Sequence, residues 1–323
     1  MQHPTESSDR GITLMRIPTL ILLLVTTTAY AQTTQTTQPA VPISRADNSK
    51  YTVEGNISYG SNPTQMIDMI YPKNAGPNAV TLSPGVVMFH GGGWIETNKA
   101  TMSSFYNRFL AHGFVVCNVE YRMAAKGTDG KYLATSALAP AAVEDALTAA
   151  KWFADHAKHY HVDPTRIVVT GASAGGHLAL MVGLATPESK LGPTATKDFQ
   201  LAAIVNGYGP ADFVQTLSSD SAAKQWLPQS IPNWMDIAKQ VSPMTYVRKD
   251  IPPLLTVIGS DDHSLAGNQR LVDQLKAAGA DARIHLVAGA GHGFNTPATA
   301  WPDAEKTIFD YLAERKIILA QAQ

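Results

Sequence analysis

The chain has 323 residues, 45% of them hydrophobic, which is enough to fill the core of one α/β domain of roughly 250–300 residues. Its 25 basic and 26 acidic residues give a net charge of −1, and no run of lysine or arginine occurs. This balance argues against a nucleic-acid binder or a protein held by an anionic membrane surface, and it indicates a small or uncharged ligand.

The first 31 residues show the pattern of a secretory signal peptide. An apolar run at 17–25, too short to span a bilayer, follows Met15 and Arg16 and precedes a small-x-small sequence that ends at Ala31. We expect a Sec-type signal over residues 1–31, with a start at Met15 or an extended n-region before it, and cleavage near Ala31. The alternative, a buried strand or helix, is disfavoured by the polar stretch that follows. The protein would then be secreted or periplasmic.

A Thr/Gln-rich stretch, residues 32–48, is expected to be a disordered lead-in to a single domain over 49–318. Cys117 is the only cysteine, so no intramolecular disulfide can form, and its apolar surroundings indicate a buried structural thiol. No cysteine just after the signal could carry a lipid, so we expect no stable membrane anchor. The sequence leaves the oligomeric state unknown.

Strands and helices alternate along the rest of the chain, which predicts a mostly parallel sheet with helices on both faces. β-Branched and apolar runs predict strands at 52–59, 66–71, 86–89, 115–119, 167–170, 201–205, 254–258 and 283–287, the first two paired antiparallel. Helical spacing of apolar residues predicts helices at 103–111, 140–154, 174–180, 267–278 and 304–312. No internal repeat or second domain is present.

Residues 211–241 have no strong period and contain Trp226 and Trp234. Aromatic residues on irregular segments beside a site often supply binding surface. We therefore interpret this segment as a small lid and both tryptophans as substrate-binding candidates. Packing of the two rings in the interior is the alternative.

Ser173 lies between the predicted strand at 167–170 and the predicted helix at 174–180, within a G-x-S-x-G pattern. Glycine before and after the serine allows a sharp strand-to-helix turn, which lifts the hydroxyl clear of the sheet. The N-terminus of the helix also presents N–H groups that favour developing negative charge. G-x-S-x-G occurs by chance in many chains, but its place between a strand and a helix indicates a nucleophile.

Three glycines follow the strand at 86–89, in the sequence HGGGW that ends at Trp94. Such a run lets the backbone approach a ligand closely and turn its N–H groups inward. The N–H groups of Gly92 and Gly93, with that of Ala174, are therefore candidates for an oxyanion hole. A flexible turn is the alternative. Trp94 is a third candidate for substrate binding.

An acid and a histidine follow the last two predicted strands. Asp262 comes after the strand at 254–258, and His292 lies in a glycine-flanked loop after the strand at 283–287. The order serine, acid, histidine, each on the loop after its own strand, is that of a catalytic triad on an open parallel sheet. Asp261 is an alternative to Asp262.

The chemistry of ester cleavage needs these residue types. A serine hydroxyl becomes a good nucleophile when an imidazole takes its proton, and a carboxylate holds that ring in the useful tautomer. We assign the base to His292, so activity should rise with pH as this imidazole loses its proton. His177 and His263 are weaker candidates for the base. His156, His159 and His161 could suggest a metal, but their spacing favours solvated histidines, and we predict no metal site.

At these motifs the chain resembles the α/β-hydrolase superfamily, in particular esterases with an HGGG motif related to hormone-sensitive lipase. It is closer still to the secreted bacterial bifunctional feruloyl and acetyl-xylan esterases. The resembling segments are 68–72, HGGGW at 90–94, VEYR at 119–122, 140–145, GASAGGHL at 171–178, YGPAD at 208–212, SPMTY at 242–246 and GHGF at 291–294. The resemblance implies a cofactor-free serine esterase with Ser173, Asp262 and His292 as its triad. Relatives usually read H-G-D-x-D before the acid, whereas this chain has Ser260, Asp261 and Asp262 in that stretch.

We therefore expect an exported carboxylic-ester hydrolase that removes acetyl or feruloyl groups from plant polysaccharide fragments through an acyl-enzyme. The partner would be a small-molecule or oligosaccharide ester. One alternative is a general short-chain carboxylesterase resembling a lipase. A metabolic relative, kynurenine formamidase, shares an HGG-x-W motif, but the export signal argues against it. A catalytically silent binding protein is a further alternative, disfavoured because a candidate exists for every member of the triad.

Overall fold

The computed structural model describes residues 41–133, 136–193, 200–216 and 220–318. The predicted signal peptide and residues 32–40 of the predicted lead-in lie outside them. In the described part of the chain, we find no helix with the length and apolar character needed to cross a membrane.

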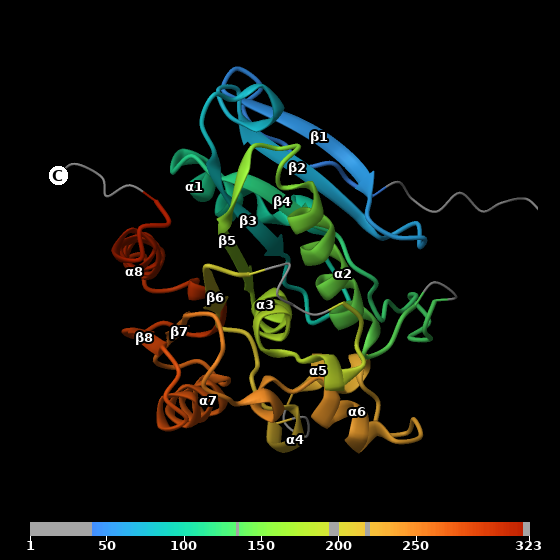
Figure 1. Cartoon of the computed structure of the whole chain (residues 1–323). Helices are drawn as coiled ribbons and strands as arrows, with labels where there is room; N and C mark the ends of the chain where they lie inside the picture. The colour runs from blue at the N-terminus through green and yellow to red at the C-terminus, as the bar shows by residue number, and fades with distance from the viewer. Residues whose placement is uncertain (1–40, 134–135, 194–199, 217–219, 319–323) are drawn as a thin grey trace, which may run out of the picture. The chain divides into compact units, whose positions relative to one another are not determined.

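The described strands form one 8-stranded sheet in the order β1-β2-β4-β3-β5-β6-β7-β8 (Figure 1). Strands β1 and β2 pair antiparallel, as predicted, and so do β2 and β4, whereas every other neighbouring pair is parallel. The strands are β1 Tyr51–Ser58, β2 Met66–Pro72, β3 Ser83–Phe89, β4 Val115–Val119, β5 Val162–Ala172, β6 Ala203–Gly207, β7 Leu254–Gly259 and β8 Ala282–Val287. The mostly parallel sheet of the sequence prediction is confirmed.

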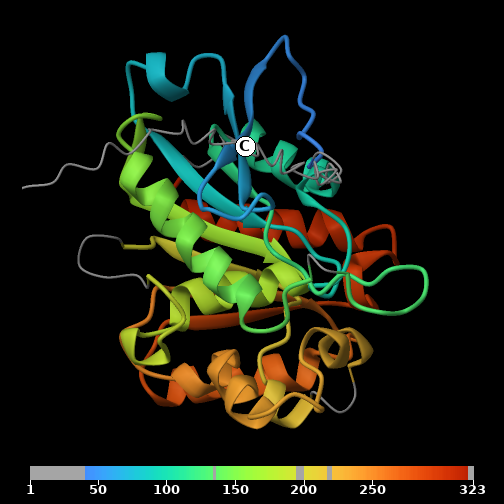
Figure 2. The same cartoon turned by 90° about the vertical axis from the view of Figure 1, so that its right-hand side faces the viewer.

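Helices cover both faces of this sheet. They are α1 Ser103–Ala111, α2 Ala141–His156, α3 Ala174–Leu184, α4 Phe213–Thr216, α5 Ser221–Trp226, α6 Trp234–Gln240, α7 Leu265–Ala277 and α8 Ala300–Glu314. Short 3₁₀ helices are η1 Gly76–Asn78, η2 Lys99–Met102, η3 Pro187–Ser189, η4 Pro243–Tyr246 and η5 His292–Phe294. In Figure 2 the green helix α2 lies in front of the sheet and the red helix α8 behind it.

Alternate residues of the central strands pack into two separate cores. Val87 and Phe89 of β3 face the core that holds α2, α3 and α7, and Val86 and Met88 face the core of α1 and α8. Strands buried on both faces read as continuous apolar runs, which is why the sequence predicted them without a period of two. Cys117 of β4 is buried and free, as predicted, and burial raises its pKa.

Helix α3 lies at the centre of the domain, and all 11 of its residues are buried. It follows β5 directly and contacts both β5 and β6, so its N-terminus is fixed at the carboxyl edge of the sheet. A helix that is apolar on every side belongs in the interior. This placement holds the turn before α3 in a rigid environment.

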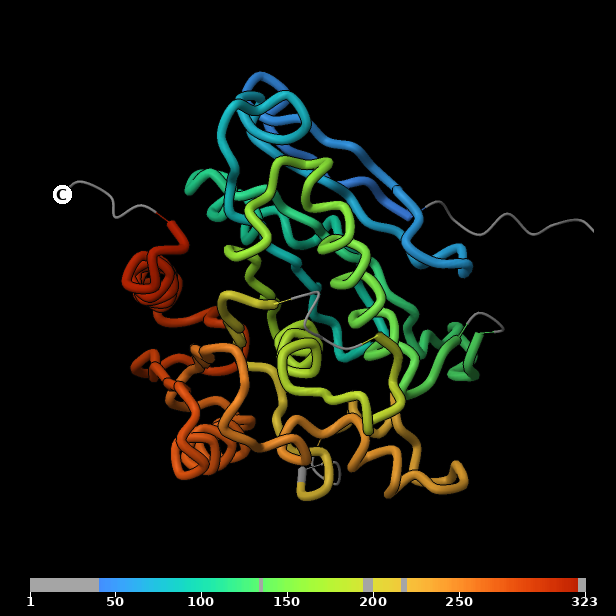
Figure 3. The backbone as a smooth tube through the Cα atoms, in the orientation of Figure 1, coloured from blue at the N-terminus to red at the C-terminus, as the bar shows by residue number. Residues whose placement is uncertain are grey.

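The segment 211–241 folds into the short helices α4, α5 and α6 instead of the irregular structure that we expected. Figure 3 follows it in gold and orange past α3. Asp220 begins α5 by accepting hydrogen bonds from the N–H groups of Ala222 and Ala223. The helices of four, six and seven residues are too short to give a readable period.

The predicted disordered lead-in is wrong for its described part, residues 41–48. These residues form no helix or strand, but Ser44 is buried and its N–H donates to Asp68 at 2.6 Å. The carbonyl of Pro42 accepts from the Lys99 ammonium at 2.7 Å. Buried polar groups of the domain therefore pair with the backbone of this segment, which the sequence composition does not reveal.

Candidate active site

Ser173 occupies the sharp turn between β5 and α3. Its φ of 57° and ψ of −119° lie in a region that residues other than glycine rarely adopt. A Cβ on Gly175 would lie 2.0 Å from the carbonyl oxygen of Phe89, and one on Gly171 would lie 2.4 Å from the Gly175 backbone. Both positions require glycine because three backbone segments meet at this turn.

The three predicted catalytic residues converge at the carboxyl edge of the sheet. Ser173 Oγ lies 2.8 Å from His292 Nε2, and His292 Nδ1 lies 2.8 Å from Asp262 Oδ2. An ionised carboxylate only accepts hydrogen bonds, so Nδ1 carries the hydrogen and Nε2 is left to accept the proton of the serine hydroxyl. This is the geometry of an activated nucleophile.

Asp262, and not Asp261, contacts the imidazole of His292. The Asp262 side chain is fully buried and also accepts the N–H of Ser264 at 2.7 Å, whereas Asp261 is exposed. Burial raises the pKa of Asp262, but hydrogen bonds from His292 and Ser264 and the nearby imidazoles outweigh it, so the pKa lies below 3.8. The carboxylate is therefore ionised at neutral pH.

The predicted oxyanion donors lie beside the nucleophile with their N–H groups unengaged. Gly92 and Gly93 follow β3 with φ values of 97° and 60°. Among the described residues, neither donates its N–H to a hydrogen bond inside the protein. Ala174 is the first residue of α3, so its N–H has no partner within the helix. All three groups are available to a bound oxyanion.

A cavity of about 300 Å³ opens over Ser173. Residues 92–96 and His292 line it, together with Asp220 and Ala222 of the 211–241 segment. A larger hollow of about 520 Å³ lies near the amino ends of β5 and β8, but arginines paired with carboxylates line it. We place the site at the smaller cavity because Ser173, the candidate nucleophile, lines it.

The structure corrects the substrate-binding predictions for the tryptophans. Trp226 is fully buried and its ring stacks on Trp94 at 4.6 Å, and the Trp94 ring is itself only 1% exposed. Trp94 belongs to the cavity wall, but Trp234 is half-buried and not among the described residues that line the cavity. Interior packing, the alternative interpretation, applies to Trp226.

His177 belongs to this aromatic cluster and cannot serve as the base. The indole N–H of Trp94 donates to His177 Nδ1 at 3.2 Å, so the Nε2 hydrogen is donated to the carbonyl of Val241 at 2.8 Å. Burial lowers the pKa of His177 to about 4, which keeps the ring neutral. His177 thus connects the HGGGW loop, the nucleophile helix and the end of the 211–241 segment.

His263 lies closer to the site than the sequence indicated. Its ring centroid is 4.7 Å from that of His292, and its Nδ1 is 3.6 Å from Asp262 Oδ1. The possible ligand atoms of these three residues all lie within 4.8 Å of one another. The hydrogen bonds of His292 and Asp262 already account for their arrangement without a metal. A histidine adjacent to the predicted acid was the only signal in the sequence.

Of the three histidines near the end of α2, His156 and His159 contact neighbouring aromatic rings, whereas His161 Nδ1 is buried with no hydrogen-bond partner among the described residues. His156 stacks on Trp152 at 3.9 Å, and its Nδ1 lies 2.7 Å from the Trp152 carbonyl oxygen. This ring is therefore held by its own helix.

Comparison with known proteins identifies the family. The sequence model of the BD-FAE family, the bifunctional feruloyl/acetyl-xylan esterase domain, matches residues 67–275. The chain belongs to the BD-FAE family. The resemblance that the motifs indicated is thereby confirmed, as is the α/β-hydrolase fold.

Curated relatives of this BD-FAE chain are named esterases. Esterase LipC of Mycobacterium tuberculosis is 25% identical over 258 residues, which cover 76% of this chain and 61% of LipC. The probable isoprenylcysteine alpha-carbonyl methylesterase ICMEL1 of Arabidopsis thaliana is 26% identical over 257 residues, covering 74% and 51%. The chain therefore spans between half and three fifths of the length of these relatives.

Solved structures similar to the BD-FAE chain share its fold. A truncated carbohydrate esterase from gut microbiota has a TM-score of 0.68 at 24% identity and covers 84% of this chain and 99% of its own. The propionate-bound esterase Est2 of Thermogutta terrifontis has a TM-score of 0.67 at 22% identity, with coverage of 84% and 97%. At these identities the likeness shows the α/β-hydrolase fold.

Proposed function

We propose that this chain is a serine carboxylic-ester hydrolase that forms an acyl-enzyme on Ser173. The observation that carries the proposal is the continuous hydrogen-bond chain from Ser173 through His292 to the buried Asp262, beside the unengaged N–H groups of the glycine loop. Membership of the BD-FAE family and the esterase names of the relatives support the same chemistry.

The residues act in two half-reactions. In the first, Ser173 Oγ attacks the ester carbonyl carbon while its proton passes to His292 Nε2. The negative charge on the carbonyl oxygen faces the N–H groups of Gly92, Gly93 and Ala174, each such donor being worth about 3–4 kcal/mol in a serine hydrolase. The imidazolium then gives its proton to the departing alcohol. In the second half-reaction, water activated by the same imidazole releases the acid.

Acetyl and feruloyl esters of plant polysaccharide fragments are the substrates we propose. The family description and the carbohydrate esterase among the structural neighbours support this class. The carboxylates of Glu96 and Asp220 at the cavity also suit an uncharged, hydroxylated alcohol group better than an anionic one. A small-molecule or oligosaccharide ester would bind without a cofactor.

Labelling with a fluorophosphonate probe tests the mechanism. The probe should modify Ser173 in the wild type, as located by mass spectrometry, and it should not modify Ser173→Ala. Ser49→Ala, which removes an exposed serine hydrogen-bonded to Asp47, is the control and should label like the wild type. Ester hydrolysis that persists at the wild-type rate in Ser173→Ala would refute the acyl-enzyme and favour a silent binding protein.

A substrate panel tests the finer proposal. Methyl ferulate and acetylated xylan should be cleaved with a higher kcat/KM than p-nitrophenyl butyrate, after correction for the more reactive leaving group. Preference for simple p-nitrophenyl esters, with no action on xylan, would instead identify a general short-chain carboxylesterase.

Export is proposed from residues 1–31 alone. If the signal is used, N-terminal sequencing of the protein recovered outside the cytoplasm should begin at Gln32. Retention of an uncleaved chain in the cytoplasm would contradict this.

A further inference from the structure

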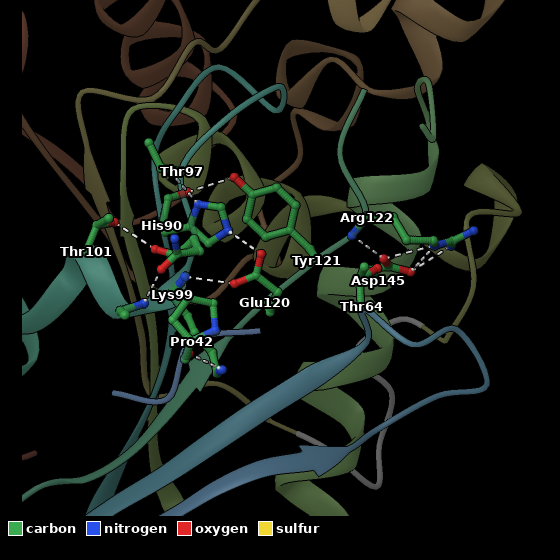
Figure 4. A network of polar contacts seen from close by, with 12 residues as sticks. Pro42, Thr64, His90, Thr97, Lys99, Thr101, Glu120, Tyr121, Arg122 and Asp145 are labelled. Atoms are coloured by element: carbon green, nitrogen blue, oxygen red, sulfur yellow. Dashed lines mark hydrogen bonds and ion pairs between the residues drawn. The ribbon is translucent and has the colours of Figure 1, made fainter. Parts of the chain in front are cut away.

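A cluster of buried ionisable residues surrounds His90, the first residue of the HGGGW sequence, and Figure 4 shows His90, Lys99 and Glu120 in one network of polar contacts. Asp68 of β2, His90 at the end of β3 and Lys99 of η2 are fully buried, and Glu120, just after β4, is 4% exposed. Burying four ionisable groups together, away from water, costs free energy unless their charges balance and their polar atoms are paired. The function described so far uses none of them.

Lys99 and Asp68 neutralise each other. The Lys99 ammonium lies 3.3 Å from Asp68 Oδ1 and donates to Asn56 Oδ1 at 2.7 Å. The backbone N–H of Lys99 donates to Glu120 Oε2 at 2.8 Å. With one positive and one negative charge already offset, the remaining pair, His90 and Glu120, must be neutral in sum.

The tautomer of His90 follows from its surroundings. His90 Nδ1 lies 2.7 Å from the Gly91 carbonyl oxygen, which only accepts, so Nδ1 carries a hydrogen. The ring stacks on Tyr121 at 4.2 Å, and the Tyr121 hydroxyl donates to the His90 carbonyl at 2.9 Å. Figure 4 shows His90 between Thr97 and Glu120. The orientation of the ring is therefore fixed on both sides.

The other nitrogen of the ring faces a carboxyl group. His90 Nε2 has no hydrogen-bond partner among the described residues, and Glu120 Oε1 lies 3.7 Å from it. An ionised Glu120 beside a neutral His90 would set two acceptors against each other away from water. A proton on Glu120 Oε1, the oxygen that faces Nε2, removes this conflict, and it also makes the pair neutral.

This proton bears on the oxyanion hole through a single peptide unit. The Gly91 carbonyl and the Gly92 N–H belong to the same planar trans peptide, so they point in opposite directions. The carbonyl accepts from His90 Nδ1 and, at 2.9 Å, from the Thr97 hydroxyl. Holding this oxygen beneath the loop aims the Gly92 N–H away from the buried cluster and toward the cavity that Gly92 lines.

We propose that Glu120 is a positioning residue whose protonated carboxyl group faces His90 Nε2 and so orients the Gly92 N–H for the oxyanion. Loss of the proton at alkaline pH leaves an ionised carboxylate against the His90 lone pair, which displaces the ring and the Gly91 carbonyl. The alkaline decline of kcat then reports Glu120. This inference rests on the proposed esterase function.

The surroundings locate the proton and its loss. Burial raises the pKa of Glu120 to about 7, against the opposing effect of Lys99, and burial lowers the pKa of His90 to about 4. Both directions place the proton on Glu120 and not on His90, and Glu120 loses it as the pH rises through about 7. The other titratable groups around the pair are Lys99, Asp68, Tyr59, whose hydroxyl donates to the Glu120 carbonyl, and Tyr121. Burial raises the pKa of both tyrosines, so they stay protonated through this range.

Glu120→Gln is the decisive variant. Its amide can donate to His90 Nε2 at any pH while its oxygen still accepts the Lys99 N–H. We expect wild-type kcat to fall at least tenfold between pH 6.5 and 9 with KM little changed, within the about 10²–10³-fold that one lost oxyanion donor costs. Glu120→Gln should keep kcat at pH 6.5 within about twofold and lack this decline. Glu144→Gln, the same change at a half-exposed residue of α2, should keep it.

Nitrogen-15 NMR of the imidazoles in the wild type gives a second readout that needs neither a variant nor activity. His90 should show a protonated Nδ1 and an Nε2 whose shift changes at the pH where kcat falls. A hydrogen on Nε2 alone, an alkaline decline that persists in Glu120→Gln, or a wild type without the decline would overturn the proposal. A wild type that cleaves no ester and is not labelled at Ser173 would refute the proposed function, while the NMR measurement would still decide whether Glu120 carries the buried proton.

Discussion

Truncation of Trp226 tests whether the 211–241 segment is a loose lid or a fixed part of the domain. The ring is fully buried, stacks on Trp94 and meets Phe213 and His177 edge to face. Removing a buried tryptophan side chain to alanine costs about 3–5 kcal/mol, which includes the cavity left behind. Each aromatic pair contributes about 0.5–1.5 kcal/mol beyond its buried area. No hydrogen bond is lost, because the indole N–H has no partner among the described residues.

We therefore expect Trp226→Ala to lower the free energy of unfolding by about 4 kcal/mol, measured by urea denaturation at pH 7. Trp226→Phe keeps a ring in the stack and should cost about 1–2 kcal/mol. Trp234→Ala, at the half-buried tryptophan of the same segment, is the matched control and should cost less than Trp226→Ala. Because Trp94 adjoins Gly93, kcat of Trp226→Ala should fall more than KM rises. A loss below about 1 kcal/mol with unchanged kcat would show that the cluster does not anchor the segment.

Three further outcomes follow from the site. Asp262→Asn should lower kcat by about 10⁴-fold, as loss of the orienting carboxylate does in a serine protease triad. The kcat of Asp261→Asn should stay within about twofold of the wild-type value, and equal losses in the two variants would contradict the assignment. Gly175→Ala should give little folded, active protein because its Cβ meets the Phe89 carbonyl at 2.0 Å, while Gly267→Ala in α7, with nothing nearer than 3.9 Å, should unfold at an equal or higher urea concentration. The lowered pKa of Asp262 stabilises the fold above pH 3.8, and this contribution is lost as the pH falls through the native pKa. The free energy of unfolding of Asp262→Asn should therefore improve relative to that of the wild type below pH 4. A difference between the two proteins that does not change with pH would refute the coupling.

The sequence predicted the sheet well because its central strands are runs of β-branched residues between turn signals. The ends of elements were less predictable. Strand β5 begins at Val162, ahead of the strand predicted at 167–170, because its pairing with β3 includes the contact of Ser83 with Val162. Local propensity does not depend on the partner strand, whereas the end of a strand is set by where its pairing with a neighbouring strand stops.

The triad could be predicted because its members follow from chemistry and from their order on the sheet. The choice between Asp261 and Asp262 could not, since adjacent residues differ only in the direction of their side chains. The turn after β7, in which the Asp262 N–H donates to the Gly259 carbonyl, directs Asp262 inward. That direction is a property of the loop and not of either residue type.

Buried contacts between distant segments were the main features that sequence reasoning missed. The stack of Trp226 on Trp94 and the proximity of Glu120 to His90 each join positions far apart in the chain. The sequence pattern around a tryptophan on an irregular segment is the same whether the ring faces a cavity or the core. A glutamate after a buried strand likewise reads as solvent-exposed until its neighbours are known.

These two contacts explain how a glycine-rich loop can hold its N–H groups in one direction. Gly92, Gly93 and Trp94 all have positive φ values, and a glycine backbone has the least intrinsic preference for any one conformation. The conformation of the loop must therefore be fixed by contacts at its two ends. His90 fixes one end through the buried polar cluster, and Trp94 fixes the other through the aromatic cluster. A left-handed conformation at a tryptophan is strained, so the stacking energy of Trp94 offsets the strain that aims the oxyanion donors.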